Sequence, residues 1–289
     1  MPAHPRPPAT VGAALQITRE RLFACGIQEA PLEAELLVAA AVGQSREWLL
    51  LHPEAPLSPR QEAELDSLVA RRCRREPLPY LLGRAEFYGL SLFVTPEVLV
   101  PRPETELLVE AAAARARPLA ARLAVDVGAG SGAVAVALAK ELPRLRVIAV
   151  DLSLGALRVA QENARRHGVG ERVLPVCADL LDALAEPADC LVANLPYVRT
   201  DEFPGLQPEV RDWEPRLALD GGPDGTGPIR RLCAQAWGHL RTGGVAAVEV
   251  GTGQAAEVAN LLAAEGFQHV ETLPDYAGIP RVVVGWRKG

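Results

Sequence analysis

The sequence predicts an α/β fold, in which a mostly parallel sheet of seven strands is preceded by a small all-α helical domain. From residue 123 onward, short apolar stretches alternate with helical ones, which is typical of a parallel sheet covered by helices on both faces. The first strand candidate runs into a glycine-rich turn, as in Rossmann-like folds. We therefore divide the chain into a helical, substrate-recognising domain (1–76), a β-hairpin connector (77–100) and an α/β domain (101–289).

Three helices are predicted in the first domain. "VGAALQITRERLFACG" ends at Gly26, and "PLEAELLVAAAVG" begins with Pro31 and ends at Gly43; both glycines are good helix stops. The third helix starts after Ser58, where Gln61 completes a capping box.

Four arginines end this third helix: Arg71, Arg72, Arg74 and Arg75. Basic side chains suit a helix C-terminus, so one interpretation is a solvated helix end. The other is a contact with an acidic partner or with RNA.

The connector contains "AEFYGLSLFV", which predicts two short strands about a turn near Gly89. The run "PRPETELLVEAAAARA" then begins a helix near Pro103.

Seven strands and four intervening helices are predicted after residue 122. The strands are 123–127, 146–151, 172–177, 189–194, 245–250, 269–273 and 281–286, and the helices are 133–142, 154–167, 227–240 and 254–265. The last two strands are joined by "PDYAGIP" alone. Because that link is too short for a crossover helix, we expect the final strand to be antiparallel.

Composition narrows the possible functions. The net charge is −6, which disfavours a protein that binds nucleic acid directly. Apolar runs are too short to span a membrane, and the N-terminus does not resemble a signal peptide. The five cysteines are scattered and the five histidines lack metal spacing, so we expect no metal site and unpaired thiols in a reducing cytoplasm. Nothing indicates an obligate oligomer, and we expect a monomer.

The glycine turn "DVGAGSGA" is the first candidate ligand site. Gly128, Ala129, Gly130, Ser131 and Gly132 lie between a strand and a helix, where the backbone and helix N-terminus can approach an anionic ligand. Asp151 ends the next strand, nineteen residues after Gly132, and can accept both ribose hydroxyls of a nucleoside. The turn fits a dinucleotide and S-adenosylmethionine equally.

The stretch "ANLPYV" decides between these cofactors. Asn194 stands at the carboxyl end of a predicted strand, where α/β sheets bind ligands. The Asn194 side-chain oxygen and the Leu195 carbonyl can each accept one N–H of a planar amino group and so aim its nitrogen at a methyl donor. Pro196 stiffens the turn, and Tyr197 can pack against the planar group. The stretch therefore favours methyl transfer to nitrogen, with S-adenosylmethionine as the donor.

Two further segments are candidates. Asp179 and Leu180 follow the third strand, where this fold usually contacts an adenine, although an ordinary loop acid is the alternative. Residues 199–227 are long, rich in Pro and Gly, and aperiodic; we expect a lid that holds the substrate, anchored by Trp213, Glu214 and Pro215.

Taken together, "PLPYLLGRAEFYGL", "VLVPRPETELLVE", "DVGAGSG", "ANLPYV", "WEPRLALDGGPDG" and "GIPRVVVG" resemble the bacterial release-factor glutamine methyltransferases (PrmC/HemK family). The resemblance covers nearly the whole chain. It implies a class I, Rossmann-like S-adenosylmethionine methyltransferase that produces S-adenosylhomocysteine. Its substrate would be the side-chain amide nitrogen (N5) of Gln in the Gly-Gly-Gln motif of peptide-chain release factors.

The resemblance also assigns roles. Residues 128–132, Asp151, Leu180 and Asn194 would contact the cofactor, residues 194–197 would hold the substrate Gln, and residues 101–106 would line the methionine end of the cofactor. One departure is Leu195, where the family usually has Pro. Because the proposed acceptor there is a backbone carbonyl, Leu can supply it at some cost in rigidity.

Asn-Leu-Pro-Tyr also occurs in enzymes that methylate adenine N6 in ribosomal RNA, and a DNA adenine methyltransferase is a related alternative. The acidic charge disfavours both, and the roughly 120 residues before the glycine turn also disfavour the ribosomal RNA enzyme. A non-catalytic nucleotide-binding module would be expected to lack Asn194 or Asp151, and both are present.

Overall fold

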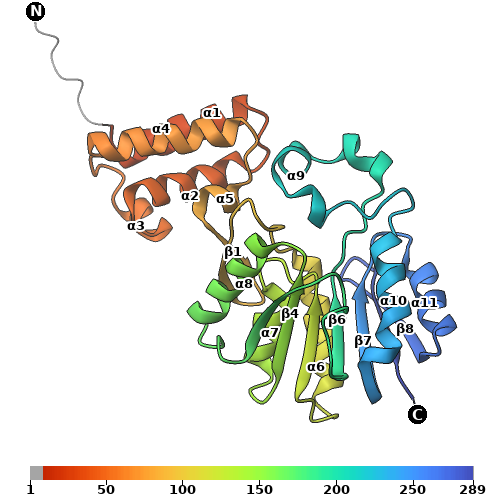
Figure 1. The fold of residues 1–289 in the computed structure, drawn as a ribbon. Coiled ribbons are helices and arrows are strands. Elements are labelled where there is room, and N and C mark those ends of the chain that lie inside the picture. Colours follow the sequence, from red (N-terminus) through yellow and green to blue (C-terminus); the bar gives the residue numbers. More distant parts are fainter. Residues whose placement is uncertain (1–8, 289) are drawn as a thin grey trace, which may run out of the picture. The chain divides into compact units, whose positions relative to one another are not determined.

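The chain folds into a helical unit and an α/β unit (Figure 1). The computed structural model describes residues 9–288, and the two compact units meet in sequence between Gly83 and Arg84. The predicted α/β fold is confirmed, including the helical region that precedes it. The connector expected at 77–100 is divided between the units, because its first residues form a helix that packs with the helical unit.

The helical unit contains five helices within residues 9–83. They are α1 (Val11–Ala24), α2 (Ala30–Val42), α3 (Arg46–Leu51), α4 (Pro59–Cys73) and α5 (Leu78–Leu82). The capping box predicted at Ser58 and Gln61 is present. The sequence did not predict α3 and α5, since helices of six and five residues are too short for a clear period.

A buried ion pair holds α2 to α4. Arg72 Nε lies 2.6 Å from Glu33 Oε2, and Arg72 Nη2 lies 3.1 Å from Glu33 Oε1. Arg71 binds Glu76, and Arg75 donates to the carbonyl of Gly26. The interpretation of this arginine run as a solvated helix end is therefore wrong for Arg72, which is buried.

A disulfide corrects the expectation of unpaired thiols. Cys25 and Cys73 are joined, with Cα atoms 5.4 Å apart. Cys25 caps α1 and Cys73 ends α4, and these two helices pack against each other. Their sequence separation of 48 residues hides this proximity in the sequence. Cys177, Cys190 and Cys233 are free.

The α/β unit begins with the predicted hairpin. Strands β1 (Arg84–Phe87) and β2 (Leu90–Phe93) pair antiparallel about Gly89. A short 3₁₀ helix, η1 (Pro103–Thr105), leads into α6 (Glu106–Ala116). The predicted start of a helix near Pro103 is therefore confirmed.

The seven-stranded sheet has the order β5-β4-β3-β6-β7-β9-β8. Its strands are β3 (Leu123–Val127), β4 (Arg146–Asp151), β5 (Val173–Cys177), β6 (Ala188–Ala193), β7 (Leu240–Glu249), β8 (Gln268–Pro274) and β9 (Pro280–Trp286). The first five are parallel, and β9 is antiparallel to both neighbours, as predicted.

Two apolar layers cover the sheet, one on each face. One layer contains residues of α6 and α7 (Ala133–Glu141), and the other contains residues of α10 (Gly227–His239) and α11 (Ala255–Ala264). Neighbouring residues of β3 alternate between the layers, Ala124 in the first and Val125 in the second. This burial on both faces explains why the strands read as continuous apolar runs. In residues 9–288, no helix has the length and apolar character needed to cross a bilayer.

Candidate active site

A cavity of about 450 Å³ opens at the carboxyl ends of β3, β4 and β6 in the α/β unit. Its lining includes ten of the twelve predicted site residues: Gly128, Ala129, Gly130, Ser131, Asp151, Asp179, Leu180, Asn194, Leu195 and Pro196. Gly132 and Tyr197 are not part of the lining. From the run 101–106, Pro101, Arg102 and Thr105 line it. The structure therefore gathers segments that lie more than a hundred residues apart in the chain.

The glycine turn forms one wall. The amides of Gly128 and Ala129 donate to the Val150 carbonyl at 2.9 and 3.0 Å. Gly128 has φ +77°, and a Cβ there would lie 3.0 Å from Leu195 Cδ2. Glycine is thus needed for both the backbone conformation and the close approach of the end of β6.

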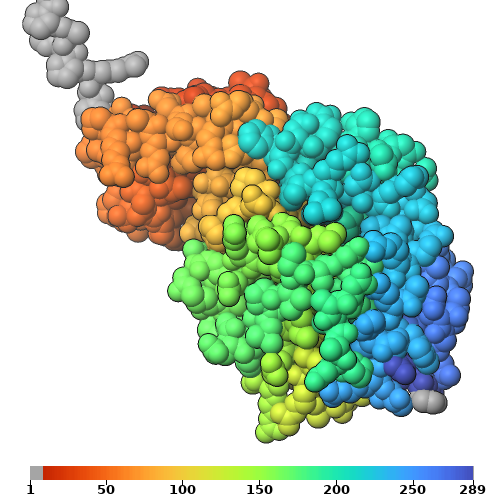
Figure 2. All heavy atoms as spheres, in the orientation of Figure 1, coloured from red at the N-terminus to blue at the C-terminus, as the bar shows by residue number. Residues whose placement is uncertain are grey.

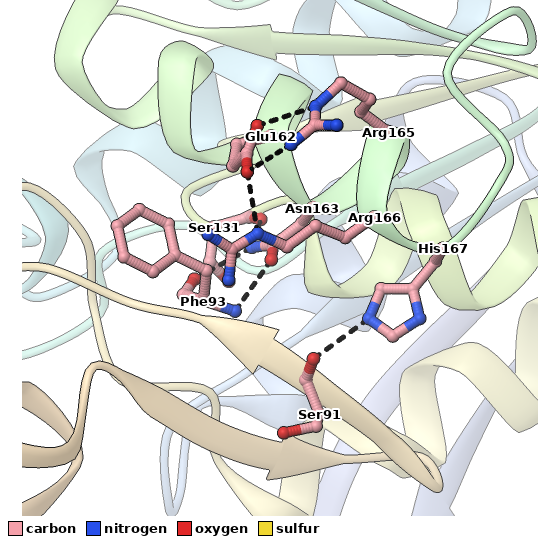
Figure 3. Close-up of polar contacts among 8 residues, drawn as sticks. All are labelled: Ser91, Phe93, Ser131, Glu162, Asn163, Arg165, Arg166 and His167. Atoms are coloured by element: carbon pink, nitrogen blue, oxygen red, sulfur yellow. Dashed lines mark hydrogen bonds and ion pairs between the residues drawn. The ribbon is translucent and has the colours of Figure 1, made fainter.

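The side chain of Asn163 in α8 (Leu154–Arg166) fixes the glycine turn by hydrogen bonds to backbone groups (Figure 3). Its Nδ2 donates to the carbonyls of Ser131 and Phe93 at 2.9 and 2.8 Å, and its Oδ1 accepts the Phe93 amide at 2.7 Å. The sequence motifs did not predict a role for this residue. The signal in the sequence was an asparagine inside a predicted helix. Asparagine has a low helix propensity, so its presence there indicates a role other than forming the helix.

Asp151 lies beside the turn at the end of β4. Its Oδ2 accepts the Gly130 amide at 2.9 Å and its Oδ1 accepts the Ser153 amide at 2.8 Å. Burial raises the pKa of its carboxyl, although these amides act in the opposite direction. The carboxyl lines the cavity, which suits a partner with two hydroxyl donors.

Asp126 is a lining residue that the sequence analysis did not assign. It is buried in β3, and its Oδ2 accepts the Ala135 amide at 3.0 Å. Burial raises its pKa to about 7. Its place as the acid two residues before the first glycine of the turn was the signal that could have identified it.

The high pKa of Asp126 gives an expected dependence of stability on pH. The folded chain keeps this proton up to about pH 7, whereas the unfolded chain releases it near pH 4. The contribution to the free energy of unfolding is therefore fully present below pH 4 and falls as pH rises toward 7. Between pH 5 and 6.5, Asp126→Asn should remove a slope of about 1.4 kcal/mol per pH unit.

Urea unfolding at several pH values measures this slope. Asp212→Asn is the matched control, because Arg211 lowers the pKa of Asp212 and this acid is ionised throughout the window. An unchanged slope in Asp126→Asn would contradict the assignment of the proton to Asp126.

Asp179 and Leu180 lie at the far side of the cavity. Asp179 Oδ2 is 2.7 Å from Arg231 Nη2 of α10, and Arg231 also lines the cavity. Leu180 is buried and has φ +50°, a left-handed conformation that is unusual for leucine. The ion pair joins this loop to α10, and the buried Leu180 side chain packs into the second apolar layer.

Asn194 follows β6 and faces the cavity. Its Nδ2 donates to Thr105 Oγ1 at 3.0 Å. Leu195 is buried in the second apolar layer. Tyr197 packs against the same layer, and its carbonyl accepts a hydrogen bond from Gln254 Nε2. Burial raises the Tyr197 pKa to about 12, and the expected stacking of Tyr197 on a substrate group stays a prediction.

The segment 199–227 contains η2 (Thr200–Gly205), α9 (Pro208–Trp213) and η3 (Arg216–Ala218); its atoms form part of the visible surface in Figure 2, in teal. Buried Glu214 anchors it, accepting the Val100 amide at 3.1 Å and binding Arg102 Nη2 at 2.5 Å. Burial raises the pKa of Glu214. Pro215 and Leu217 then line the cavity.

Comparison with known proteins identifies the family of this chain. Residues 13–83 match the model of the PrmC N-terminal domain, and residues 103–204 match the methyltransferase small domain. The chain is 46% identical to the release factor glutamine methyltransferase of Geobacter sulfurreducens, over 96% of each chain. It is 44% identical to that of Moorella thermoacetica, over 96% of this chain and 99% of the other.

Solved structures share the fold. The catalytic domain of hMettl16, solved with an RNA hairpin, has a TM-score of 0.57 and 16% identity, with 77% of this chain and 82% of that chain covered. The fold and the site define an S-adenosylmethionine-dependent methyltransferase of the Rossmann-like class. Among these enzymes, the chain belongs to the family of release factor glutamine methyltransferases.

Proposed function

We propose that this enzyme transfers a methyl group from S-adenosylmethionine to the side-chain amide nitrogen (N5) of the Gln in the Gly-Gly-Gln motif of peptide-chain release factors. The near full-length similarity to enzymes named for this activity carries the proposal. The placement of Asn194 and Leu195 on the cavity supports it.

The cavity fits S-adenosylmethionine. The left-handed glycines at 128 and 130 line the cavity and allow the backbone to approach a ligand, and Asp151 offers carboxylate oxygens for a ribose. The sulfonium supplies a methyl group that is activated for attack by nitrogen. By position, Pro101, Arg102 and Thr105 belong to the methionine end and Asp179 and Leu180 to the adenine end.

The chain's own contribution is chiefly orientation of the glutamine. An amide nitrogen is a weak nucleophile, since its lone pair is delocalised into the carbonyl. The Asn194 Oδ1 and the Leu195 carbonyl each accept one N–H, which fixes both donors and turns the face of the nitrogen toward the methyl group. Bound S-adenosylmethionine would give up its methyl group to this nitrogen and leave as S-adenosylhomocysteine, and the displaced amide proton would pass to water. Arg102 and Glu214 hold the substrate-side segment 199–227 beside this position.

The proposed setting is a monomer in the cytoplasm that contacts the release factor and no nucleic acid directly. The net charge of −6 supports the absence of an extended phosphate-binding surface. We assign recognition of the release factor to the helical unit.

The test is incubation of the purified chain with S-adenosylmethionine and a release factor, followed by mass spectrometry of the Gly-Gly-Gln peptide. One added methyl on Gln is the expected result. A release factor with Ala in place of that Gln is the control and should gain none. Transfer to ribosomal RNA or DNA, with none to the factor, would instead support the adenine N6 alternative and overturn the proposal.

A further inference from the structure

We propose that Thr105 and Glu249 are positioning residues that hold the Asn194 amide with its oxygen toward the reacting nitrogen. This inference rests on the proposed function and deepens it, because it explains what sets the direction of the Asn194 side chain.

The three side chains come from separate segments. Thr105 ends η1, Asn194 follows β6, and Glu249 ends β7. The parallel register places Ala193 opposite Val248, so that Asn194 and Glu249 leave their strands side by side. Asn194 Nδ2 donates to Thr105 Oγ1 at 3.0 Å. The same register brings the Glu249 carboxyl beside Asn194. Burial has the larger effect and raises the pKa of Glu249, and interactions with the Thr105 and Asn194 side chains lower that pKa.

Glu249 lies behind the cavity wall and not on its surface. Its exposed fraction is 1%, and that of Thr105 is 5%. Thr105 lines the cavity and Glu249 does not. Glu249 Oε2 has no hydrogen-bond partner among the residues that the structure describes. A buried carboxyl of this kind is costly, and its polar contacts lead to the active-site asparagine.

The two ends of an asparagine amide are opposite in character, since Nδ2 donates and Oδ1 accepts. Acceptors on one side of the group hold Nδ2 there and turn Oδ1 to the other side. On this arrangement, Oδ1 is presented to the N–H donors of the substrate amide. A reversed amide would set donor against donor and lose the hydrogen bond on which orientation depends.

Glu249 also sets the direction of the Thr105 hydroxyl. A threonine hydroxyl can donate or accept, and a carboxyl group offers an acceptor oxygen in either protonation state. When Thr105 donates its hydrogen to Glu249, its lone pairs are left for Asn194 Nδ2. The chain of hydrogen bonds then has one direction, from Asn194 through Thr105 to Glu249.

Thr105→Val tests this chain of hydrogen bonds, because it removes the hydroxyl and keeps the shape. We expect kcat to fall by about 10- to 100-fold, the size of loss that follows a small misplacement of a reacting group. The Kd for S-adenosylhomocysteine should stay within about twofold of the unmodified chain. Thr105→Ser restores the hydroxyl and should recover most of kcat, and Glu249→Gln should reduce kcat in the same direction as Thr105→Val.

A second readout follows the asparagine itself and does not depend on the methyl acceptor. The side-chain ¹H–¹⁵N amide signal of Asn194, assigned by its loss in Asn194→Ala, is recorded with S-adenosylhomocysteine bound. Thr105→Val and Glu249→Gln should shift it and speed its hydrogen exchange, and Thr105→Ser should not. Val284→Ala is the control for lost stability, since Val284 is buried in β9 away from the cavity. It should lower Tm and leave both kcat and the signal unchanged.

Wild-type kcat together with an unchanged Asn194 signal in Thr105→Val would overturn the positioning role. A fall in kcat that Val284→Ala reproduces at equal loss of Tm would also overturn it. If the unmodified chain does not methylate the release factor, the proposed function is wrong. The amide signal then decides by itself whether Thr105 and Glu249 orient Asn194.

Discussion

Replacing Asn194 with alanine is expected to reduce methyl transfer by about 100- to 1000-fold, the cost of removing one preorganised hydrogen-bonding group from an active site. Asn194 lines the cavity, and its Nδ2 is held by Thr105. Under the proposed function, its loss would remove an acceptor for the substrate amide and leave the nitrogen without its orientation toward the methyl group. Because we assign cofactor binding mainly to the glycine turn and Asp151, we expect the Kd of the cofactor to change by less than about threefold, or under 1 kcal/mol.

Single-turnover transfer at saturating cofactor measures the first quantity, and calorimetric titration with S-adenosylhomocysteine measures the second. Asn260→Ala is the matched control, because Asn260 is an exposed asparagine on α11. It should leave both quantities unchanged. Turnover at the wild-type rate in Asn194→Ala would remove the acceptor role from this residue.

Replacing Gly132 with alanine should produce the largest loss of stability at the glycine turn. Gly132 has φ +77°, and a Cβ there would lie 2.9 Å from Ala160 Cβ and 3.0 Å from Ala160 Cα. The left-handed conformation costs about 1 to 2 kcal/mol for a residue with a side chain. Pushing α8 away from the start of α7 adds about 1 to 3 kcal/mol.

Gly168→Ala separates these two costs. Gly168 has φ +70°, but a Cβ there would meet nothing within 4 Å. Urea unfolding should therefore show a loss of about 1 to 2 kcal/mol for Gly168→Ala and a loss larger by about a further 1 to 3 kcal/mol for Gly132→Ala. Equal losses would mean that the contact with Ala160 relaxes at no cost. Cofactor affinity should fall in Gly132→Ala and stay unchanged in Gly168→Ala.

The sheet was well predicted because each strand is a local apolar pattern. The bounds of 123–127 and 146–151 coincide with β3 and β4, and the short link before β9 revealed its antiparallel direction. By contrast, α3 and α5 are too short to display the helical periodicity of apolar residues. The Cys25–Cys73 disulfide depends on the packing of α1 and α4, which no local pattern encodes.

The residues of the site also fall into two groups, those that a local sequence pattern predicts and those that it does not. Gly128, Asp151 and Asn194 could be predicted, since each stands in a recognisable position at the end of a strand. Asn163 and Glu249 could not, because their importance arises from contacts with segments tens of residues away. Sequence motifs thus indicate groups that face a ligand, and the structure adds the groups that hold them in place.

The hydrogen bonds of Asn163 have a practical consequence for dissecting the chain. The methyltransferase family model begins at residue 103, yet Asn163 ties the Phe93 backbone to the glycine turn (Figure 3). Phe87 and Leu99 also line the cavity. Residues 84–102 are therefore a structural part of the catalytic fold and not a disposable linker. A gene fragment intended to encode that fold alone should begin at Arg84, because one that begins at residue 103 would lack part of the cavity wall.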